Sequence, residues 1–202
     1  MGMTCTLWRV ALSDAQRLAN ASPDQIEEFL FGERIRTRSP AKRRGLIGWL
    51  KSLSPITIET TTGPLQPPDS SHTLARGQLD LDWAWHGLHF LLTSTAWEGD
   101  EPACFLLKGG DDLGEDEIGN DVPRVLSPVQ VQRFAQFLAQ LSPEELTRRY
   151  NPARMMKLEI YHEVWNRGGE SELPDLLDAF EQLREFVRTA ATEGEAVIVL
   201  VT

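Results

Sequence analysis

The sequence predicts a helix-rich α+β fold, in which helices surround a small mixed β-sheet that includes a strand from each end of the chain. Three observations support this class. The segments at 4–11 and 196–202 are short and rich in β-forming residues. Four serine-headed motifs of the kind that starts helices lie between them. Leucines recur at helical spacing just before the last strand.

Composition and length favour a single domain over residues 1–202. A chain of this length is within the usual size of one domain, and its 41% hydrophobic content is enough to build a core. The segment at about 33–79 differs from the rest, because basic residues are followed there by many Pro, Gly, Thr and Ser residues. We expect it to form an irregular insertion or flap, with a short helix at about 42–52.

The first strand and four helix starts can be read from local motifs. The strand at 4–11 ends at a Ser-Asp pair. The four helix starts share a serine followed three residues later by Gln or Glu, the pattern of a capping box, in which each side chain bonds a backbone N–H of the other residue. In three of them proline occupies the first helical position, where no hydrogen bond is lost. These starts are Ser13, Ser22, Ser127 and Ser142, and they predict helices at about 13–20, 23–31, 128–140 and 143–150.

The middle and the end of the chain supply the remaining elements. We expect a helix at 80–95, a buried strand at 103–108 and a glycine-rich acidic loop at 109–121. The helix that begins near Leu173 should stop at Gly194, because glycine readily ends a helix. The strand at 196–202 is apolar at successive positions, which predicts a central strand covered on both faces.

Charge and cysteine content narrow the classes of function. The chain carries a net charge of −10, which disfavours general nucleic-acid binding. Residues 33–51 hold seven Lys or Arg against one Glu (7 − 1 = +6), which leaves −16 for the remainder. Cys5 and Cys104 lie in apolar segments and predict buried thiols in a reducing cytoplasm. No secretory leader or membrane-spanning run is expected, so we expect no membrane partner.

The candidate site lies on the helix predicted at 80–95. At about 100° per residue, Asp82, His86, His89 and Thr93 fall on one stripe about 60° wide. Trp85 and other apolar residues flank that stripe on both sides, which predicts a buried helix. A polar stripe on a buried helix must find internal partners, since an unpaired buried polar group costs about 1–3 kcal/mol.

Three interpretations of the stripe remain open. The first is a structural hydrogen-bond network, the second is a pocket for a small ligand, and the third is a metal site. The metal interpretation is the least supported, because the His-x-x-His spacing lacks the glutamate of HExxH. In the pocket interpretation, Trp85, Arg124, Tyr161 and Trp165 complete the lining; otherwise Arg124 forms a salt bridge, and Tyr161 and Trp165 pack in the core from one helical face.

An enzyme is the alternative to a binding protein. His86 or His89 would then act as general base and Asp82 would orient it, in a reaction of hydrolase or transferase type. The sequence contains no G-x-S-x-G motif, and no nucleophile or catalytic residue can be assigned from it.

Several motifs together resemble a known family. They are Met1-Gly2-Met3, Trp85-His86-x-Leu88-His89-x-Leu91-Leu92-Thr93, Gly109-Gly110, Pro123-Arg124 with Leu126 and Pro128, and Ile160-Tyr161 with Trp165. The chain is similar in these motifs to the YfbM-like family of small bacterial proteins, a domain of unknown function (1877). The resemblance implies a single α+β domain in a bacterial cytoplasm and brings no established activity.

The function therefore stays unknown at the level of the sequence. The interpretation we favour is a non-enzymatic, cytoplasmic binding or accessory protein, whose partner is a small-molecule ligand or another protein. The sequence names no cofactor and assigns no metal.

Overall fold

The computed structural model describes residues 2–32, 76–119, 121–162, 165 and 172–202. The basic segment at 33–51 and the short helix expected at 42–52 lie outside these ranges. The elements follow in the order β1 (Cys5–Val10), α1 (Leu12–Leu18), α2 (Pro23–Phe31), β2 (Gly77–Asp80), α3 (Ala84–Thr93), β3 (Asp111–Asp112), β4 (Arg124–Leu126), α4 (Pro128–Gln140), α5 (Pro143–Arg149), α6 (Pro152–Lys157), α7 (Glu172–Glu193) and β5 (Ala196–Val201).

The five strands form one sheet in the order β2-β1-β5-β4-β3. The α+β class is confirmed, and both terminal strands belong to the sheet. Every neighbouring pair is antiparallel, so the expectation of a mixed sheet was wrong. The alternation of side chains along a strand reveals which faces are buried but not the direction of the strand. β5 pairs with β1 on one side and with β4 on the other, which confirms its predicted central place.

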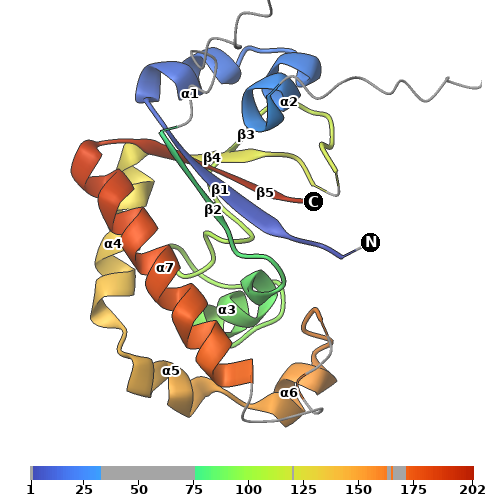
Figure 1. Ribbon diagram of the computed structural model, residues 1–202, viewed down its shortest axis with the longest axis vertical. Coiled ribbons are helices and arrows are strands. Elements are labelled where there is room, and N and C mark those ends of the chain that lie inside the picture. The colour runs from blue at the N-terminus through green and yellow to red at the C-terminus, as the bar shows by residue number, and fades with distance from the viewer. Residues whose placement is uncertain (1, 33–75, 120, 163–164, 166–171) are drawn as a thin grey trace, which may run out of the picture.

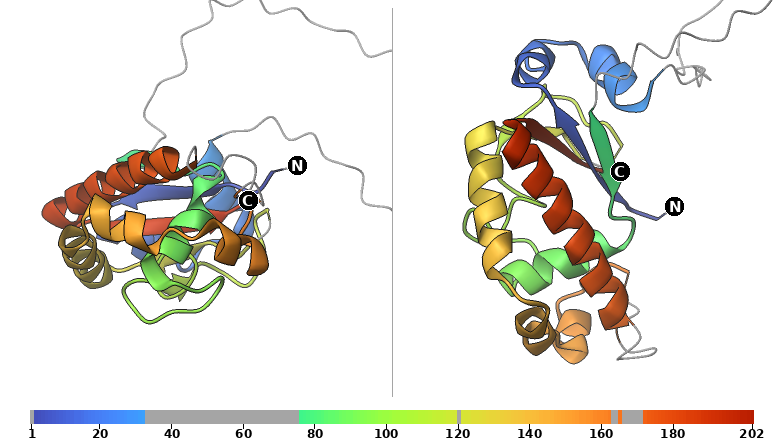
Figure 2. Two further views of the ribbon diagram at one scale, coloured as in Figure 1. Left: turned by 90° about the horizontal axis from the view of Figure 1, so that it is seen from below. Right: turned by 60° about the vertical axis from the view of Figure 1, so that its left-hand side comes forward.

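Helices cover both faces of the sheet, and the apolar side chains of β5 pack against the helices on each face. Its six residues are all buried. Val197, Val199 and Val201 pack into the cluster that includes residues of α3, α4 and α7. Ile198 and Leu200 pack into a second cluster with residues of α1 and α2. Figure 1 shows α1 and α2 at one end of the molecule, and Figure 2 shows α4 and α7 side by side.

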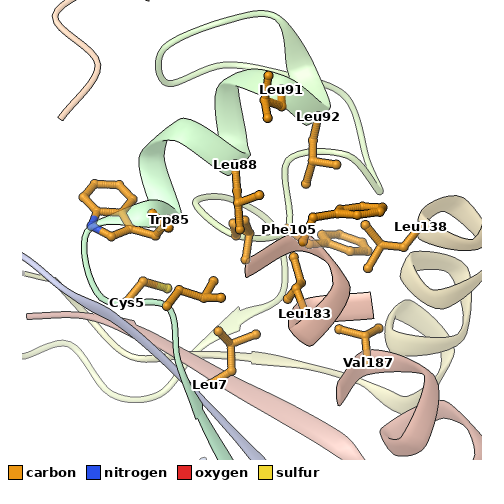
Figure 3. Close-up of a cluster of buried hydrophobic side chains, with 14 of the residues drawn as sticks. Cys5, Leu7, Trp85, Leu88, Leu91, Leu92, Phe105, Leu138, Leu183 and Val187 are labelled. Atoms are coloured by element: carbon orange, nitrogen blue, oxygen red, sulfur yellow. The ribbon is translucent and has the colours of Figure 1, made fainter. Parts of the chain in front are cut away.

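The larger cluster surrounds α3 and supports the candidate site. Figure 3 shows side chains of β1, α3, α4, α7 and the turn at 103–109 meeting there. The labelled residues are Trp85, Leu88, Leu91 and Leu92 of α3, Cys5 and Leu7 of β1, Leu138 of α4, Leu183 and Val187 of α7, and Phe105. α3 therefore packs against α7 and α5 within the cluster that covers one face of the sheet, which explains why it is apolar on most of its surface.

Three of the four predicted helix starts have the expected serine cap. Ser22 and Ser127 form complete capping boxes, and Ser142 accepts a hydrogen bond from the backbone N–H of Glu145. Ser13 does not cap α1, because that helix begins one residue earlier and Ala11 occupies the cap position. α7 ends before Gly194, whose φ of 67° suits glycine, as predicted.

Two predicted elements differ from the structure. Residues 103–108 form turns and not a strand, with local bonds such as Lys108 N–H to Cys104 O at 2.8 Å. Residues 104–106 are buried, but a short apolar run does not distinguish a strand from other buried structure. Residues 77–79, which we assigned to the irregular insertion, belong to β2. The helix expected at 80–95 is shorter and begins only at Ala84.

Among the described residues, no helix is both long enough and apolar enough to cross a membrane.

Candidate functional site

The candidate site is built on α3, which is buried from residue 84 to residue 92. Glycine at position 87 allows close packing, because a Cβ there would lie 2.7 Å from Cη2 of Trp165 and 2.8 Å from Cδ2 of Leu176. His86 and His89 are fully buried on this helix. Their side chains must therefore find partners within the protein.

Asp82 does not belong to the stripe predicted on the helix. It precedes α3 in a turn with φ of 45°, and its side chain is exposed. The backbone N–H of Asp82 donates to Oδ1 of Asp80 at 2.8 Å, which stabilises the turn. In the described part of the chain, no hydrogen bond or ion pair joins Asp82 to His86 or His89. The stripe on the helix therefore includes only residues from Ala84 onward.

His86 connects two backbone segments outside α3, one that follows the helix directly and one that lies 75 residues further along the chain. Its Nε2 donates to the carbonyl oxygen of Ala96 at 2.8 Å, and its Nδ1 accepts from the backbone N–H of Tyr161 at 2.8 Å. This pair of bonds requires the neutral Nε2–H tautomer. Burial lowers the pKa of His86 below its ordinary 6.5, and the bond to Ala96 opposes that shift in part.

His89 holds the next part of the same loop. Its Nε2 donates to the carbonyl oxygen of Glu98 at 3.1 Å, while its buried Nδ1 has no hydrogen-bond partner among the described residues. Burial is the main cause that lowers the pKa of His89 to about 4, followed by the nearby His86. The bond to Glu98 opposes the shift, and the charges of Lys108 and Arg124 add to it.

Thr93 completes the polar face where the helix ends. Its Oγ1 donates to the carbonyl oxygen of His89 at 2.8 Å and lies 3.0 Å from Oγ1 of Thr95. Ser94 then takes a left-handed conformation with φ of 61°, which turns the chain back along the helix. We call residues 94–101 the Trp97 loop. The three polar residues of the stripe all bond the backbone or side chains of this turn and loop.

Two arginines from outside α3 bind the end of this helix and the first residue of the Trp97 loop. Nη1 of Arg149 donates to the carbonyl oxygens of Leu91 at 3.1 Å and Leu92 at 3.4 Å. Nη2 of Arg154 donates to the carbonyl oxygen of Ser94 at 3.0 Å. These bonds satisfy carbonyl groups that the end of a helix leaves without partners.

Aromatic rings gather around His86. The Trp85 ring stacks on the imidazole with centroids 4.8 Å apart, and the Trp97 ring lies 4.3 Å from it. Trp97 is 50% exposed, whereas Trp85 is buried. Trp85 also stacks on Tyr161 at 5.7 Å and donates from Nε1 to the carbonyl oxygen of Met3. The indole of Trp97 is thus half-exposed on the loop and packs against the buried rings of His86 and Trp85.

Tyr161 and Trp165 have separate structural contacts. The Tyr161 hydroxyl accepts from the backbone N–H of Met3 at 2.7 Å. Trp165 is buried against Gly87 and donates from Nε1 to the carbonyl oxygen of Ile160 at 2.9 Å. Both residues lie in turns rather than on one helical face, so that part of the prediction was wrong.

Arg124 lies at the start of β4 and is buried. Its Nη1 donates to the carbonyl oxygen of Gly109 and its Nη2 to that of Leu106, both at 3.0 Å. No ion pair with a carboxylate was found within the described ranges, so the predicted salt bridge was not found there. Burial lowers the pKa of Arg124, and Asp121 is the first of the charges that oppose this shift. The arginine thereby fixes the turn at 103–109.

The structure therefore brings part of the predicted site together. Five of the predicted residues share contacts beneath or beside the Trp97 loop, namely Trp85, His86, His89, Thr93 and Tyr161. Asp82, in contrast, is exposed and precedes the helix. The described residues include no group of three His, Cys, Asp or Glu side chains that could hold a metal ion.

The roles of Trp97, Arg149 and Arg154 were not predicted from the sequence. A signal for Trp97 was present, because a single tryptophan precedes the polar run Glu98-Gly-Asp-Glu101, where a large apolar residue is unusual. Arg149 and Arg154 gave no such signal, since their acceptors are about 60 residues away in sequence.

Comparison with known proteins gives the family and the fold. A family model described as a domain of unknown function, DUF1877, matches residues 1–200. The chain belongs to the DUF1877 family. Among solved structures, this DUF1877 protein is similar to YfbM from Escherichia coli, a protein of unknown function. The two are 18% identical, the match covers 98% of this chain and 99% of that chain, and the TM-score is 0.64. No curated protein matches the chain.

Proposed function

We propose that this DUF1877 protein is a non-enzymatic binding protein and that the Trp97 loop is its contact surface. The proposal rests on the hydrogen bonds of His86 and His89. Both are buried, and both donate from Nε2 to carbonyl oxygens of the loop that carries the half-exposed Trp97. The polar stripe of α3 thus supports a surface loop, and a tryptophan on such a loop is a common anchor in protein interfaces.

The contacts of the histidines favour binding over catalysis. A general base needs a lone pair within reach of its substrate. Nδ1 of His86 already accepts from Tyr161, and Nδ1 of His89 is buried. An enzyme that uses either histidine with Asp82 as orienter would need a different arrangement of this helix. No other observation favours the hydrolase or transferase alternative.

Charge points to a basic protein surface as the partner. The chain has a net charge of −10, and the Trp97 loop contains Glu98, Asp100 and Glu101. Glu98 pairs with Lys108, and Glu101 pairs with Arg133. Complementary charge guides encounter and orientation, while the buried apolar anchor contributes most of the affinity. The two free, buried cysteines suit the reducing cytoplasm that we propose as its compartment.

Selection of binding peptides tests this proposal. Immobilised protein is panned against a peptide library of net positive charge and, in parallel, against a matched library of net negative charge. We expect binders from the basic library, and Trp97→Ala should weaken them by at least tenfold, because anchor residues contribute roughly 2 kcal/mol or more. Val129→Ala is the matched control, since Val129 is also exposed, at 70%, but lies on α4.

Two outcomes would count against this function. One is that no basic peptide binds, or that its affinity is the same for wild type and Trp97→Ala. The other is that a small metabolite raises the melting temperature of wild type and of Trp97→Ala equally, which would favour the ligand pocket predicted from the sequence.

A further inference from the structure

We propose that His86 is a pH-operated clasp, which holds the turn at Tyr161 against α3 when it is neutral and releases that turn when it is protonated. The clasp itself does not depend on the proposed binding function. Its consequence for a bound partner does rest on that function.

The geometry makes the two bonds of His86 respond differently to a proton. At neutral pH, Nδ1 accepts from the Tyr161 N–H at 2.8 Å. A proton added to Nδ1 would turn the acceptor into a donor, so two N–H groups would face each other and the bond would be lost. The bond from Nε2 to the Ala96 oxygen keeps its donor and becomes charge-assisted. Protonation therefore weakens only the connection to Tyr161.

Release at Tyr161 reaches a second segment. The Tyr161 hydroxyl accepts from the Met3 N–H, and Trp85 donates to the Met3 oxygen. A shift of the Tyr161 turn would therefore loosen the chain just before β1. The rings of Trp85 and Trp97 lie against His86 and can hold an imidazolium by cation–π attraction, so the charged ring keeps its place on the loop side.

The elements packed against His86 carry several titratable or charged groups. On α3 the titratable neighbour is His89, whose ring centroid lies 6.5 Å from that of His86. On the Trp97 loop they are Glu98, which pairs with Lys108, Glu101, which pairs with Arg133, and Asp100. In the turn at 160–162 they are the Tyr161 phenol and the exposed His162. Burial lowers the pKa of His86, which sets the transition below pH 6.5.

The same proton would act on the proposed partner. An imidazolium would place a positive charge beneath Trp97, whose ring centroid is 4.3 Å from that of His86. A basic surface seated on Trp97 would then be repelled across a partly buried site, where charges are weakly screened. If the Trp97 loop binds a basic partner, the partner is released as the pH falls.

Fluorine NMR on the free protein tests the clasp without any partner. The six tryptophans are labelled as 5-fluorotryptophan, and each resonance is assigned by a Trp→Phe variant. We expect the Trp85 and Trp97 resonances to shift with one common midpoint below pH 6.5. The Trp8 resonance should stay unchanged, because Trp8 packs in the cluster on the other face of the sheet. Protection of the Tyr161 amide from hydrogen exchange, corrected for intrinsic pH dependence, should fall about five- to tenfold across the same midpoint.

Variants connect the transition to one residue. His86→Asn keeps an oxygen acceptor close to the Nδ1 position and cannot titrate, so its Trp85 and Trp97 resonances should not shift. His162→Asn should leave the transition intact. The proposal is overturned if Trp97 does not respond before global unfolding, or if His86→Asn responds like wild type. If His86→Asn does not fold, the Tyr161 amide in His162→Asn decides: unchanged protection overturns the clasp.

Discussion

Acidification is expected to destabilise the protein through His89. The pKa of His89 is lowered to about 4 in the folded protein, against 6.5 for an ordinary histidine. Near pH 5 the unfolded chain therefore carries a proton on this histidine and the folded protein does not. The contribution of His89 to the stability of the fold is fully present above about pH 6.5. It is lost as the pH falls toward 4, because the unfolded state binds more protons than the folded state in that window.

The magnitude follows from the same two values. Each pH unit within the window costs about 1.4 kcal/mol, and the change from pH 6.5 to pH 5 covers roughly 1.5 units. His89 alone should therefore lower the free energy of unfolding by about 2 kcal/mol between about pH 7.5 and about pH 5. The lowered pKa of His86 acts in the same direction and adds to the total for wild type.

Comparison with His89→Gln isolates this contribution. The glutamine amide can donate to the Glu98 oxygen in place of Nε2 and cannot titrate. We expect urea unfolding, followed by circular dichroism, to show a pH-dependent loss smaller by about 2 kcal/mol in His89→Gln than in wild type. His162→Gln is the control, because His162 is exposed, and it should behave like wild type. Equal pH dependence in wild type and His89→Gln would refute the reasoning.

Three further predictions concern packing, capping and thiol reactivity. Gly87→Ala should lower stability by about 1–2 kcal/mol in thermal unfolding, because a Cβ 2.7 Å from Trp165 outweighs the better helix propensity of alanine; an unchanged melting temperature would contradict this. Ser127→Ala should cost about 1 kcal/mol through loss of its capping box, whereas Ser13→Ala should cost almost nothing, and equal losses would contradict the assignment. Burial raises the pKa of Cys5 to about 12, so a disulfide reagent at about pH 8 should label this thiol only after unfolding, and rapid labelling of the native protein would contradict it.

Local signals in the sequence predicted several elements correctly. The boxes at Ser22 and Ser127 involve residues only three apart, so the information lies within one turn of the helix. β5 could be recognised because its apolar residues face two cores at once. The buried state of His86 and His89 followed from the apolar residues on both sides of them.

Long-range and backbone effects could not be predicted in this way. Asp82 was assigned to the helix, because its positive φ and the turn made with Asp80 leave no periodic signal. The turn at 103–109 depends on Arg124, whose acceptors lie 15 and 18 residues away. The acceptors of the two histidines are carbonyl groups, which every residue has, so no side-chain pattern identifies the loop that they hold.

The tautomeric state of His86 and His89 decides whether these residues support the Trp97 loop as described. In the structure both histidines are neutral donors to the Trp97 loop. Nitrogen-15 NMR of the labelled imidazoles at neutral pH distinguishes the two tautomers from the charged form. We expect a protonated Nε2 and an unprotonated Nδ1 in both rings. A proton on Nδ1 of either ring, in the other tautomer or in an imidazolium, would contradict it.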